Sequence, residues 1–540
     1  MPTHEVRNQV PPITPFEVSR DPGLLAGLHR EGAGWAEAEV HELGMLAGSE
    51  RVQEWGRLAN ENPPVLRTHD RYGNRIDEVE FHPHWHDLMT VAVEHGLQGA
   101  PWADGRPGAH VARAAKFYVW GAADAGHMCP ISMTYAAIPA LRHNPDLAAK
   151  YEPLLTARTY DFGLREPSTK AGLIAGMSMT EKQGGSDVRS NTTAATPRPD
   201  GSYRILGHKW FTSAPMSDMF LTLAQAPGGL SCFLLPRVLP DGSRNPIRLQ
   251  RLKDKLGNKS NASAEIEYED ATGWLIGAEG AGVKTIIEMV NMTRLDCVIG
   301  SSIGMRLAAV HAVHHARYRS AFGAALVDQP AMRNVLADLV IESEAATTVM
   351  LRLAGATDRA TTDPAEAALR RIALAVTKYW VCKRAPVHAA EALECLGGNG
   401  YVEESGMPRL YREAPLMSIW EGSGNVAALD ALRAMGTQPE TVEAYFAEVA
   451  SARGENPHLD HAIDRVGKEL ADHSDIEYRA RRVVELMALV LQGAQLVRHG
   501  HRAVADAFCA SRLGEDWGAA FGTLPVGVDT GAIIERAFAG

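Results

Sequence analysis

The hydrophobic period of this 540-residue chain changes twice along its length. From about residue 36 to 164, apolar residues recur every three or four positions, which is typical of helices. Between 173 and 276, short apolar runs alternate with turn signals such as Asp200-Gly201, which favour strands and hairpins. The helical period returns near Gly282. This order predicts an α+β multidomain fold in which a β-domain lies between helical domains.

The chain is too long for one hydrophobic core, so we divide it into five segments. An irregular arm rich in Pro and Gly comes first, and a further helical domain comes last. The predicted bounds are 1–35 for the arm, 36–172 for the N-terminal helical domain, 173–276 for the antiparallel β-domain, 277–436 for a four-helix bundle domain and 437–540 for the additional helical domain.

Long helices are expected at three places in the bundle, 282–319, 330–357 and 364–396. Pro386 lies inside the third pattern, where it should kink or interrupt the helix because proline lacks the N–H that a helix interior needs.

Charge and cysteine usage restrict the class of protein. The chain holds 54 basic and 65 acidic residues, a formal net charge of −11, so any binding of nucleic acid would depend on a local patch. The six cysteines form no CxxC pair, which favours buried, reduced thiols. We find no basic leader followed by an apolar run, and no stretch of ~20 apolar residues. We therefore expect a cytoplasmic protein that does not contact a membrane.

Two segments of the β-domain carry candidate chemistry. In Met179–Asp187 a strand-like run ends at hydroxyl residues and a Gly pair, which suits the close approach of carbonyls or phosphates. In Gly207–Ala214 an aromatic residue, Phe211, stands two positions before Ser213, so both share one strand face and suit a flat heteroaromatic cofactor. The alternatives are a plain turn for the first segment, and a core aromatic with a surface hydroxyl for the second.

Two further segments lie in the bundle. Gly397-Gly398 is expected to end a helix. Glu421 stands just before a helical pattern, where it either favours the helix dipole, with Ser423 or Asn425 as the cap, or serves as a general base on a loop.

Together these segments resemble the acyl-CoA dehydrogenase family, whose members read approximately M-T-E-P-x-x-G-S-D, G-x-K-x-W-I-T, R-x-x-F-G, G-G-x-G-Y and Y-E-G-T in this order. The resemblance covers about residues 36–436. The runs Arg30–Trp35, Leu252–Asn258 and Trp420–Asn425 are similar to the AidB-type branch, the alkylation-response members, which carry an extra C-terminal helical domain.

The family resemblance implies non-covalently bound FAD and a homotetramer, because subunits of the family complete one another's cofactor sites. Phe211 takes the place of the family's Trp beside the flavin ring, and Ser213 that of its Thr near flavin N5. The implied cofactor-binding residues are Met179, Thr180, Ser186, Phe211, Thr212, Ser213, Arg319, Phe322, Gln329, Gly397, Gly398, Ser423 and Asn425.

Glu421 matches the family's catalytic base, which removes the α-proton of an acyl-CoA thioester while a hydride passes from the β-carbon to the flavin. Some relatives place the base before an Arg of the long helix, and here that position is Thr293. Lys182 replaces the family's usual Pro, as in the AidB-type branch, which implies weak activity on short or branched acyl-CoA. A further hypothesis is that the protein is an acyl-CoA oxidase.

The AidB-type resemblance also implies an alternative function, in which the protein binds double-stranded DNA and shields it from alkylating agents or inactivates them, with the dehydrogenase activity residual. The candidate DNA-binding residues are Arg479, Arg481, Arg482, Arg498 and Arg502. Residues 441–540 hold ten basic and fifteen acidic residues, so these arginines could instead pair with acids on solvated helix faces. His82, His84 and His86 alternate, but we predict no metal site.

Overall fold

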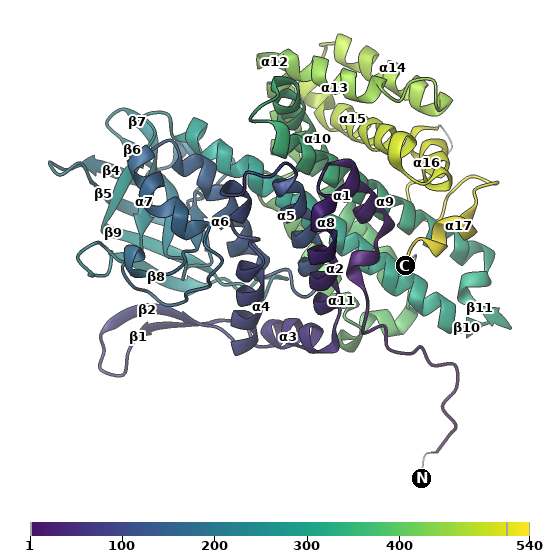
Figure 1. The fold of residues 1–540 in the computed structure, drawn as a ribbon, viewed down its shortest axis with the longest axis horizontal. Coiled ribbons are helices and arrows are strands. Elements are labelled where there is room, and N and C mark those ends of the chain that lie inside the picture. Colours follow the sequence, from purple (N-terminus) through teal and green to yellow (C-terminus); the bar gives the residue numbers. More distant parts are fainter. Residues whose placement is uncertain (1–2, 515–516, 539–540) are drawn as a thin grey trace. The chain divides into compact units, whose positions relative to one another are not determined.

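The computed structural model describes residues 3–514 and 517–538. The chain, shown in Figure 1, divides into two compact units. Unit 1 comprises residues 1–50, 107–122 and 294–540, and unit 2 comprises residues 51–106 and 123–293. The predicted order of helical, β and helical segments is confirmed.

Unit 2 is built around a seven-stranded sheet. Its strands are β3 Ala175–Ser178, β4 Ala194–Pro197, β5 Tyr203–Ser213, β6 Met219–Ala226, β7 Gly229–Pro236, β8 Ile247–Leu252 and β9 Ser263–Ile276. The remaining elements of this unit are α3 Glu50–Glu61, β1 Val65–His69, β2 Arg75–Glu80, α4 Pro83–Glu94, α6 Met128–Leu141, α7 Pro145–Leu155 and the short 3-10 turns η3 Ala100–Trp102, η4 Pro167–Thr169 and η5 Val188–Ser190.

The strand order is β3-β6-β4-β5-β9-β7, with β8 on β9, and β6 also pairs with β7. The last pairing closes a ring of five strands, so these strands leave few backbone groups unpaired. Most pairs are antiparallel, as predicted, and Asp200-Gly201 indeed joins the antiparallel pair β4 and β5. The pairs β3–β6 and β4–β6 are parallel.

A β-hairpin, β1–β2, lies inside the segment that was predicted to be helical. Arg237, which is buried after β7, holds this hairpin to the sheet, since its guanidinium donates to the carbonyl of Asp77 at 3.0 Å and to that of Pro215. Arg244 forms an ion pair with Glu78 of the same hairpin at 2.6 Å. The helical prediction failed here because these contacts lie far apart in sequence.

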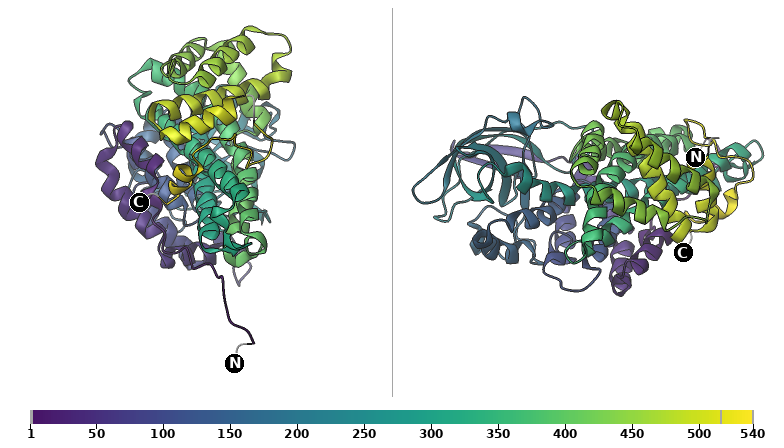
Figure 2. Two further views of the ribbon diagram at one scale, coloured as in Figure 1. Left: turned by 90° about the vertical axis from the view of Figure 1, so that its right-hand side faces the viewer. Right: turned by 90° about the horizontal axis from the view of Figure 1, so that it is seen from above.

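Unit 1 is helical. Its main helices are α1 Pro22–Arg30, α2 Glu37–Ala47, α5 Ala109–Gly121, α9 Pro330–Arg359, α10 Pro364–Cys395, α11 Met407–Ile419, α12 Gly424–Thr437, α13 Glu440–Ala450, α14 Pro457–Ala471, α15 Ile476–His499, α16 Arg502–Phe508 and α17 Thr530–Glu535, together with most of α8 Gly282–Tyr318. The short elements are η1 Val18–Arg20, η2 Gly34–Ala36, β10 Ser320–Ala321, β11 Ala324–Ala325, η6 Leu326–Asp328, η7 Gly397–Tyr401, η8 Glu403–Ser405 and the π-helical turn η9 Cys509–Leu513. The extra C-terminal helices pack on the bundle, with α15 against α9, α10 and α12 (Figure 2).

The N-terminal arm is not irregular throughout, because it contains helix α1. Asp21 caps this helix by accepting from the N–H of Gly23 at 2.8 Å, and Pro22 follows at the first helical position. The same carboxylate accepts the buried hydroxyl of Tyr118 at 2.6 Å, which docks the arm on α5. The Asp-Pro pair was the sequence signal for this helix.

Pro386 does not interrupt α10, which runs without a break from Pro364 to Cys395. The helix packs against α9, α11, α12, α13 and α15. His388, two residues after Pro386, is buried. Its ring bonds the carbonyl of Leu339 in α9 at 3.0 Å, which holds this turn of α10 in place. Tertiary packing therefore compensates the backbone hydrogen bond that proline removes.

Two expectations about burial can be compared with the structure. All six cysteines are buried and free. Within the described ranges, one helix, α8, is long and apolar enough to cross a membrane, and 72% of its most apolar window is buried inside the protein, as in the core helix of a globular domain.

The end of the chain is fixed to the bundle by a buried ionic cluster. The fully buried Arg512 forms ion pairs with Asp338 and Glu342 of α9. Glu342 also pairs with Arg384 of α10 at 3.3 Å, and the N–H of Gly522 donates to Asp338 at 2.9 Å. The additional C-terminal domain is therefore part of the bundle's core.

We expect Arg512→Ala to lower the free energy of unfolding of unit 1 by about 3–5 kcal/mol, because it removes the cation that Asp338 and Glu342 share and leaves Glu342 with Arg384 alone. Chemical denaturation followed by far-UV circular dichroism measures this. Arg482→Ala is the matched control, since its side chain is 71% exposed, and should change stability by less than about 0.5 kcal/mol. Equal losses of unfolding free energy in the two variants would contradict the conclusion that Arg512 stabilises the bundle through its buried ion pairs.

Candidate active site

The residues that the sequence singled out fall into two groups, one in each compact unit. Six lie in unit 2, in the loop after β3 and at the end of β5. The others lie in unit 1, around the ends of α8, α10, α11 and α15.

Glu181 anchors the loop that follows β3. It is fully buried and accepts the backbone N–H groups of Thr192 at 2.7 Å and Thr193 at 3.1 Å, and the amino group of Lys209 at 2.9 Å. Burial alone would raise its pKa, but these donors outweigh burial, so the pKa of Glu181 lies below its usual range. The two motif segments of the β-domain are thereby joined by one buried ion pair.

The predicted loop residues Met179, Thr180 and Ser186 surround this anchor. The carbonyl of Thr180 accepts the N–H of Trp210 at 2.8 Å, which joins the loop after β3 to strand β5. Gly185 is required here, because a Cβ on it would lie 2.4 Å from the Thr180 hydroxyl. Ser186 is exposed at the outer side of the turn. The Gly pair thus serves close packing inside the loop as well as access from outside.

The end of β5 presents an aromatic face. Phe211 is 49% exposed and Ser213 is partly exposed, with its hydroxyl 3.1 Å from that of Ser263. The Thr212 side chain is buried and bonds the hydroxyl of Ser178, so its hydroxyl is not on the face of Phe211. A register shift in this stretch lets Trp210 and Phe211 share one cation, with the Lys253 amino group 3.2 Å and 4.9 Å from the two ring centres.

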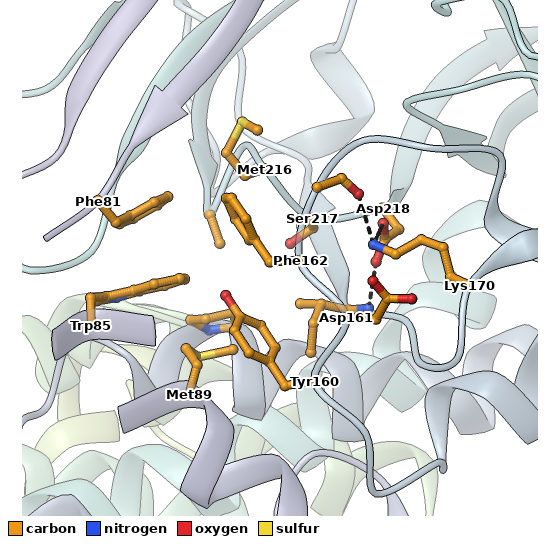
Figure 3. A pocket seen from close by; sticks show the side chains of 14 residues that line it. Phe81, Trp85, Met89, Tyr160, Asp161, Phe162, Lys170, Met216, Ser217 and Asp218 are labelled. Atoms are coloured by element: carbon orange, nitrogen blue, oxygen red, sulfur yellow. Dashed lines mark hydrogen bonds and ion pairs between the residues drawn. The ribbon is translucent and has the colours of Figure 1, made fainter. Parts of the chain in front are cut away.

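A small pocket in unit 2 was not predicted (Figure 3). Phe81 and Trp85 stack with ring centres 3.9 Å apart on one side of it. On the other side Lys170 pairs with Asp218 at 2.6 Å, and burial raises the pKa of Asp218 to about 6 despite this cation. Its lining residues are Phe81, Trp85, Met89, Pro130, Tyr160, Asp161, Phe162, Gly163, Lys170, Ile174, Ala214, Met216, Ser217 and Asp218.

Glu421 lies in a short turn between α11 and α12. Its backbone has a φ of +57°, a conformation that few residues other than glycine adopt. The carbonyl of Glu421 accepts Nε of Arg294 at 3.1 Å, and the next carbonyl, that of Gly422, accepts the amino group of Lys378. Arg294 is itself paired with Asp430 of α12 at 2.6 Å. Strained backbone held by buried groups is common at functional sites.

Ser423 and Asn425 follow at the start of α12. Ser423 occupies the N-cap position, but its side chain makes no capping hydrogen bond, so the predicted cap is absent. Asn425 instead accepts Nε of Arg481 at 2.7 Å, from helix α15 of the additional domain. The extra domain therefore reaches residues that match the family's cofactor contacts.

The remaining predicted cofactor residues lie on the surface of unit 1. Phe322 is fully exposed in the turn between β10 and β11, and Arg319 donates to the carbonyl of Asn8 at 2.7 Å. Gln329 donates to the carbonyl of Ala321 at 3.1 Å just before α9. Gly397 and Gly398 follow the end of α10 as predicted, and both are exposed.

The five candidate DNA-binding arginines differ in their partners. Arg479 pairs with Glu469 at 2.6 Å and with Asp472 at 3.3 Å, and Arg482 pairs with Glu469 at 3.2 Å. Arg502 lies 3.5 Å from Asp506 with 93% of its side chain exposed. Arg498 is exposed at the end of α15, and Arg481 bonds Asn425. They do not form a single unpaired basic face.

The histidines of the Phe81–His86 run have other partners. His84 bonds Asp87 at 2.8 Å, and His86 bonds the hydroxyl of Tyr160 at 2.9 Å. Across residues 3–514 and 517–538, no group of three or more His, Cys, Asp or Glu side chains is arranged to hold a metal ion.

Comparison with known proteins identifies the family. Three family profiles match: the AidB N-terminal domain at residues 8–162, and the middle and C-terminal domains of acyl-CoA dehydrogenases at residues 176–271 and 280–436. AidB of Escherichia coli (strain K12) is 46% identical over 517 residues, which are 95% of this chain and 94% of that protein. The chain belongs to the acyl-CoA dehydrogenase family.

This acyl-CoA dehydrogenase family member has similar relatives in animals. The acyl-CoA dehydrogenase family member 11 of Caenorhabditis elegans is 30% identical over 497 residues, which are 86% of this chain and 80% of that protein. The crystal structure of C. elegans ACDH-11 in complex with C11-CoA superposes with a TM-score of 0.86 at 27% identity, over 95% of this chain and 92% of the other. The acyl-CoA dehydrogenase from Bacillus anthracis complexed with FAD gives 0.62 at 18% identity, over 84% and 80%, which shows the fold alone.

The comparison of sequence motifs did not identify Glu181, Lys209 and Lys378, the residues that hold the predicted site residues in place. Glu181 and Lys209 stand inside the two quoted motifs, so their pairing could have been proposed from the sequence. Lys378 lies in no motif, and only the fold brings it to the turn at Glu421.

We expect Glu181→Gln to reduce the stability of the β-domain by about 3–5 kcal/mol at pH 7, because it leaves Lys209 buried without its counter-ion. Since the pKa of Glu181 is lowered in the folded state, its ionised form stabilises the fold fully above about pH 4.3, the ordinary value for Glu. This contribution is lost as the pH falls further.

Unfolding temperatures of the wild type and Glu181→Gln, measured between pH 7 and pH 3, should therefore converge at low pH. Glu267→Gln, at an exposed position of β9, is the control and should follow the wild type throughout. A gap that stays constant with pH would show that the carboxylate's charge is not responsible.

Proposed function

We propose that this protein is an AidB-type, FAD-dependent acyl-CoA dehydrogenase-like oxidoreductase of the cytoplasm, acting weakly on short or branched acyl-CoA thioesters. Family membership supports the reaction class, and the nematode relative crystallised with C11-CoA supports acyl-CoA as the substrate class. The observation that carries the proposal is Glu421, a carboxylate at the family's base position in a strained turn whose carbonyls are held by Arg294 and Lys378.

The residues of unit 2 suit a flavin. Phe211 leaves about half of an aromatic ring exposed at the end of β5, and the Ser213 hydroxyl lies on the same strand face. An apolar ring beside a hydrogen-bonding group is the combination that a flat heteroaromatic ring requires. Met179, Thr180, Ser186, Phe211 and Ser213 would hold the flavin ring, and the Thr212 backbone would lie beside them. Within unit 1, Ser423 and Asn425 match the family's cofactor contacts.

Glu421 supplies the general base in this mechanism. Its carboxylate takes the proton from the α-carbon of the thioester, and the electron pair of that C–H bond forms the new double bond to the β-carbon. When bound, FAD accepts the hydride that leaves the β-carbon. The strained turn keeps the carboxylate on a loop between two helices, where positioning supports proton transfer.

Homotetramer formation is part of the proposal. Phe322 exposes its whole side chain, and an exposed aromatic of this size favours contact with another subunit. Arg319, Gln329, Gly397 and Gly398 share the surface character expected of residues that meet a neighbouring subunit's cofactor.

The purified protein should show the visible absorption bands of a flavin, and anaerobic addition of isovaleryl-CoA should bleach them. Glu421→Gln should keep the bands but slow the bleaching by about 10²–10⁴-fold, the usual contribution of a general base. Stopped-flow absorbance measures both. A colourless protein that FAD does not reconstitute, or an unchanged rate in the variant, would overturn the proposal, and hydrogen peroxide released during turnover in air would instead indicate an oxidase.

The alternative function is binding of double-stranded DNA by the additional domain, with protection against alkylating agents. The exposed guanidinium groups of Arg482 and Arg502 favour it, because exposed arginines can neutralise phosphates. Their pairing with Glu469 and Asp506, and the acidic balance of the domain, oppose it.

A gel-shift titration at low salt tests the alternative. DNA binding predicts a shift that weakens as salt rises and that Arg482→Ala plus Arg502→Ala reduces. Arg512→Lys, at a fully buried position, keeps the net charge and serves as the control. We expect no salt-dependent shift if the dehydrogenase-like function is the main one.

A further inference from the structure

Lys378 is a buried lysine in the middle of α10. Only 1% of its surface is exposed. Its amino group donates to the carbonyl of Gly422 and lies 3.4 Å from the carbonyl of Ser418, in the last turn of α11. These two carbonyls stand on either side of Glu421 in the chain. Lys378 therefore spans the turn that carries the proposed base.

A buried ammonium group needs compensation, because leaving water costs several kcal/mol per ion. No acidic side chain in the part of the chain that the structure describes forms an ion pair with Lys378. The compensation comes from carbonyls at the C-terminal end of α11, where the helix leaves carbonyls unpaired and its dipole is negative. The position suits a cation, and the contacts that hold the cation also fix the turn.

The other charged and titratable groups around this turn come from four helices. Lys383 of α10 and Arg481 of α15 border Gly424, where a Cβ would lie 3.5 Å from Nζ of Lys383 and 3.4 Å from Nη2 of Arg481. Arg294 of α8 donates to the carbonyl of Glu421 and pairs with Asp430 of α12, to which Arg371 of α10 also donates at 2.9 Å. Cys297 and Cys382 lie beside Lys378, and burial raises the pKa of both thiols, which keeps them neutral. Asp430 is already paired with Arg294 and Arg371. The charge of Lys378 thus remains directed at the turn.

We propose that Lys378 is a positioning residue for Glu421: it fixes the orientation of the catalytic turn through two carbonyls and favours the ionised state of the base through its charge. This inference rests on the proposed function, in which Glu421 is the base. Two consecutive carbonyls, those of Glu421 and Gly422, are held by two buried cations, Arg294 and Lys378. That clamp maintains the left-handed backbone of Glu421, which would otherwise relax.

Two substitutions separate the two parts of this role. Lys378→Gln keeps a hydrogen-bond donor and removes the charge, whereas Lys378→Met removes both. Flavin reduction by isovaleryl-CoA is measured by stopped flow from pH 5 to pH 9, together with the visible flavin spectrum and the unfolding temperature. Lys468→Met is the control, because Lys468 is an exposed lysine of α14, away from the turn at Glu421.

We expect Lys378→Met to slow flavin reduction by about 10²-fold, since a small displacement of a reacting group has an effect of this size, while the half-saturating acyl-CoA concentration stays unchanged. Lys378→Gln should recover part of the rate. In both variants the acidic limb of the rate profile should move to higher pH by about one unit, because a cation near the base has been removed. Lys468→Met should match the wild type.

The outcomes distinguish a failure of the proposed function from a failure of the positioning role of Lys378. A wild type whose flavin isovaleryl-CoA does not reduce would overturn the proposed function itself. A wild type that is reduced, with Lys378 variants that show the same rate and the same acidic limb, would overturn the positioning role alone. If Lys378→Met does not fold, the Gln variant decides, and a Gln variant that folds, binds flavin and retains the wild-type profile is sufficient to reject the inference.

Discussion

The buried ion pair between Glu181 and Lys209 is the contact on which the arrangement of the candidate residues in the β-domain depends. It joins the loop after β3 to strand β5, and it does so at full burial, where an ion pair persists only with good geometry and further hydrogen bonds. The N–H groups of Thr192 and Thr193 supply those bonds. With the loop fixed in this way, the adjacent Thr180 and the exposed Phe211 take defined positions at one end of the sheet.

The candidate residues of the bundle, in unit 1, are organised by the same principle with the signs of the charges reversed. There the fixed charges are cations, Arg294 and Lys378, and their acceptors are backbone carbonyls of the turn between α11 and α12. Backbone acceptors hold a turn more firmly than side chains do, because no side-chain rotation is left. The strained backbone of Glu421 is therefore held by the interior of the bundle.

The additional C-terminal domain is integrated into this arrangement. Arg512 buries its charge against α9, and Arg481 bonds Asn425 at the start of α12. The domain thus supports both the core of the bundle and the edge of the candidate cofactor site. Arg479 and Arg481 of this domain bond to partners within the chain, whereas Arg482 and Arg502 remain largely exposed.

The sequence by itself determined the order of helical and β segments, most strand positions and the identity of the motif residues, because hydrophobic period and turn chemistry are local properties. The hairpin at Asp200-Gly201 lies where the pattern predicted it. The Asp21-Pro22 cap and the Glu181–Lys209 pair were also within reach of local reasoning, since their residues stand in recognisable patterns.

Only the tertiary structure decided which side chains hold the motifs in place. Lys378 is 44 residues away from Gly422 in the chain, Arg294 is 127 from Glu421, and Arg481 is 56 from Asn425. No periodicity links such positions. Pro386 remains helical for the same reason, since packing against neighbouring helices outweighs its local preference. Long-range burial, which brings distant charges out of water together, is a property of the fold and not of any segment.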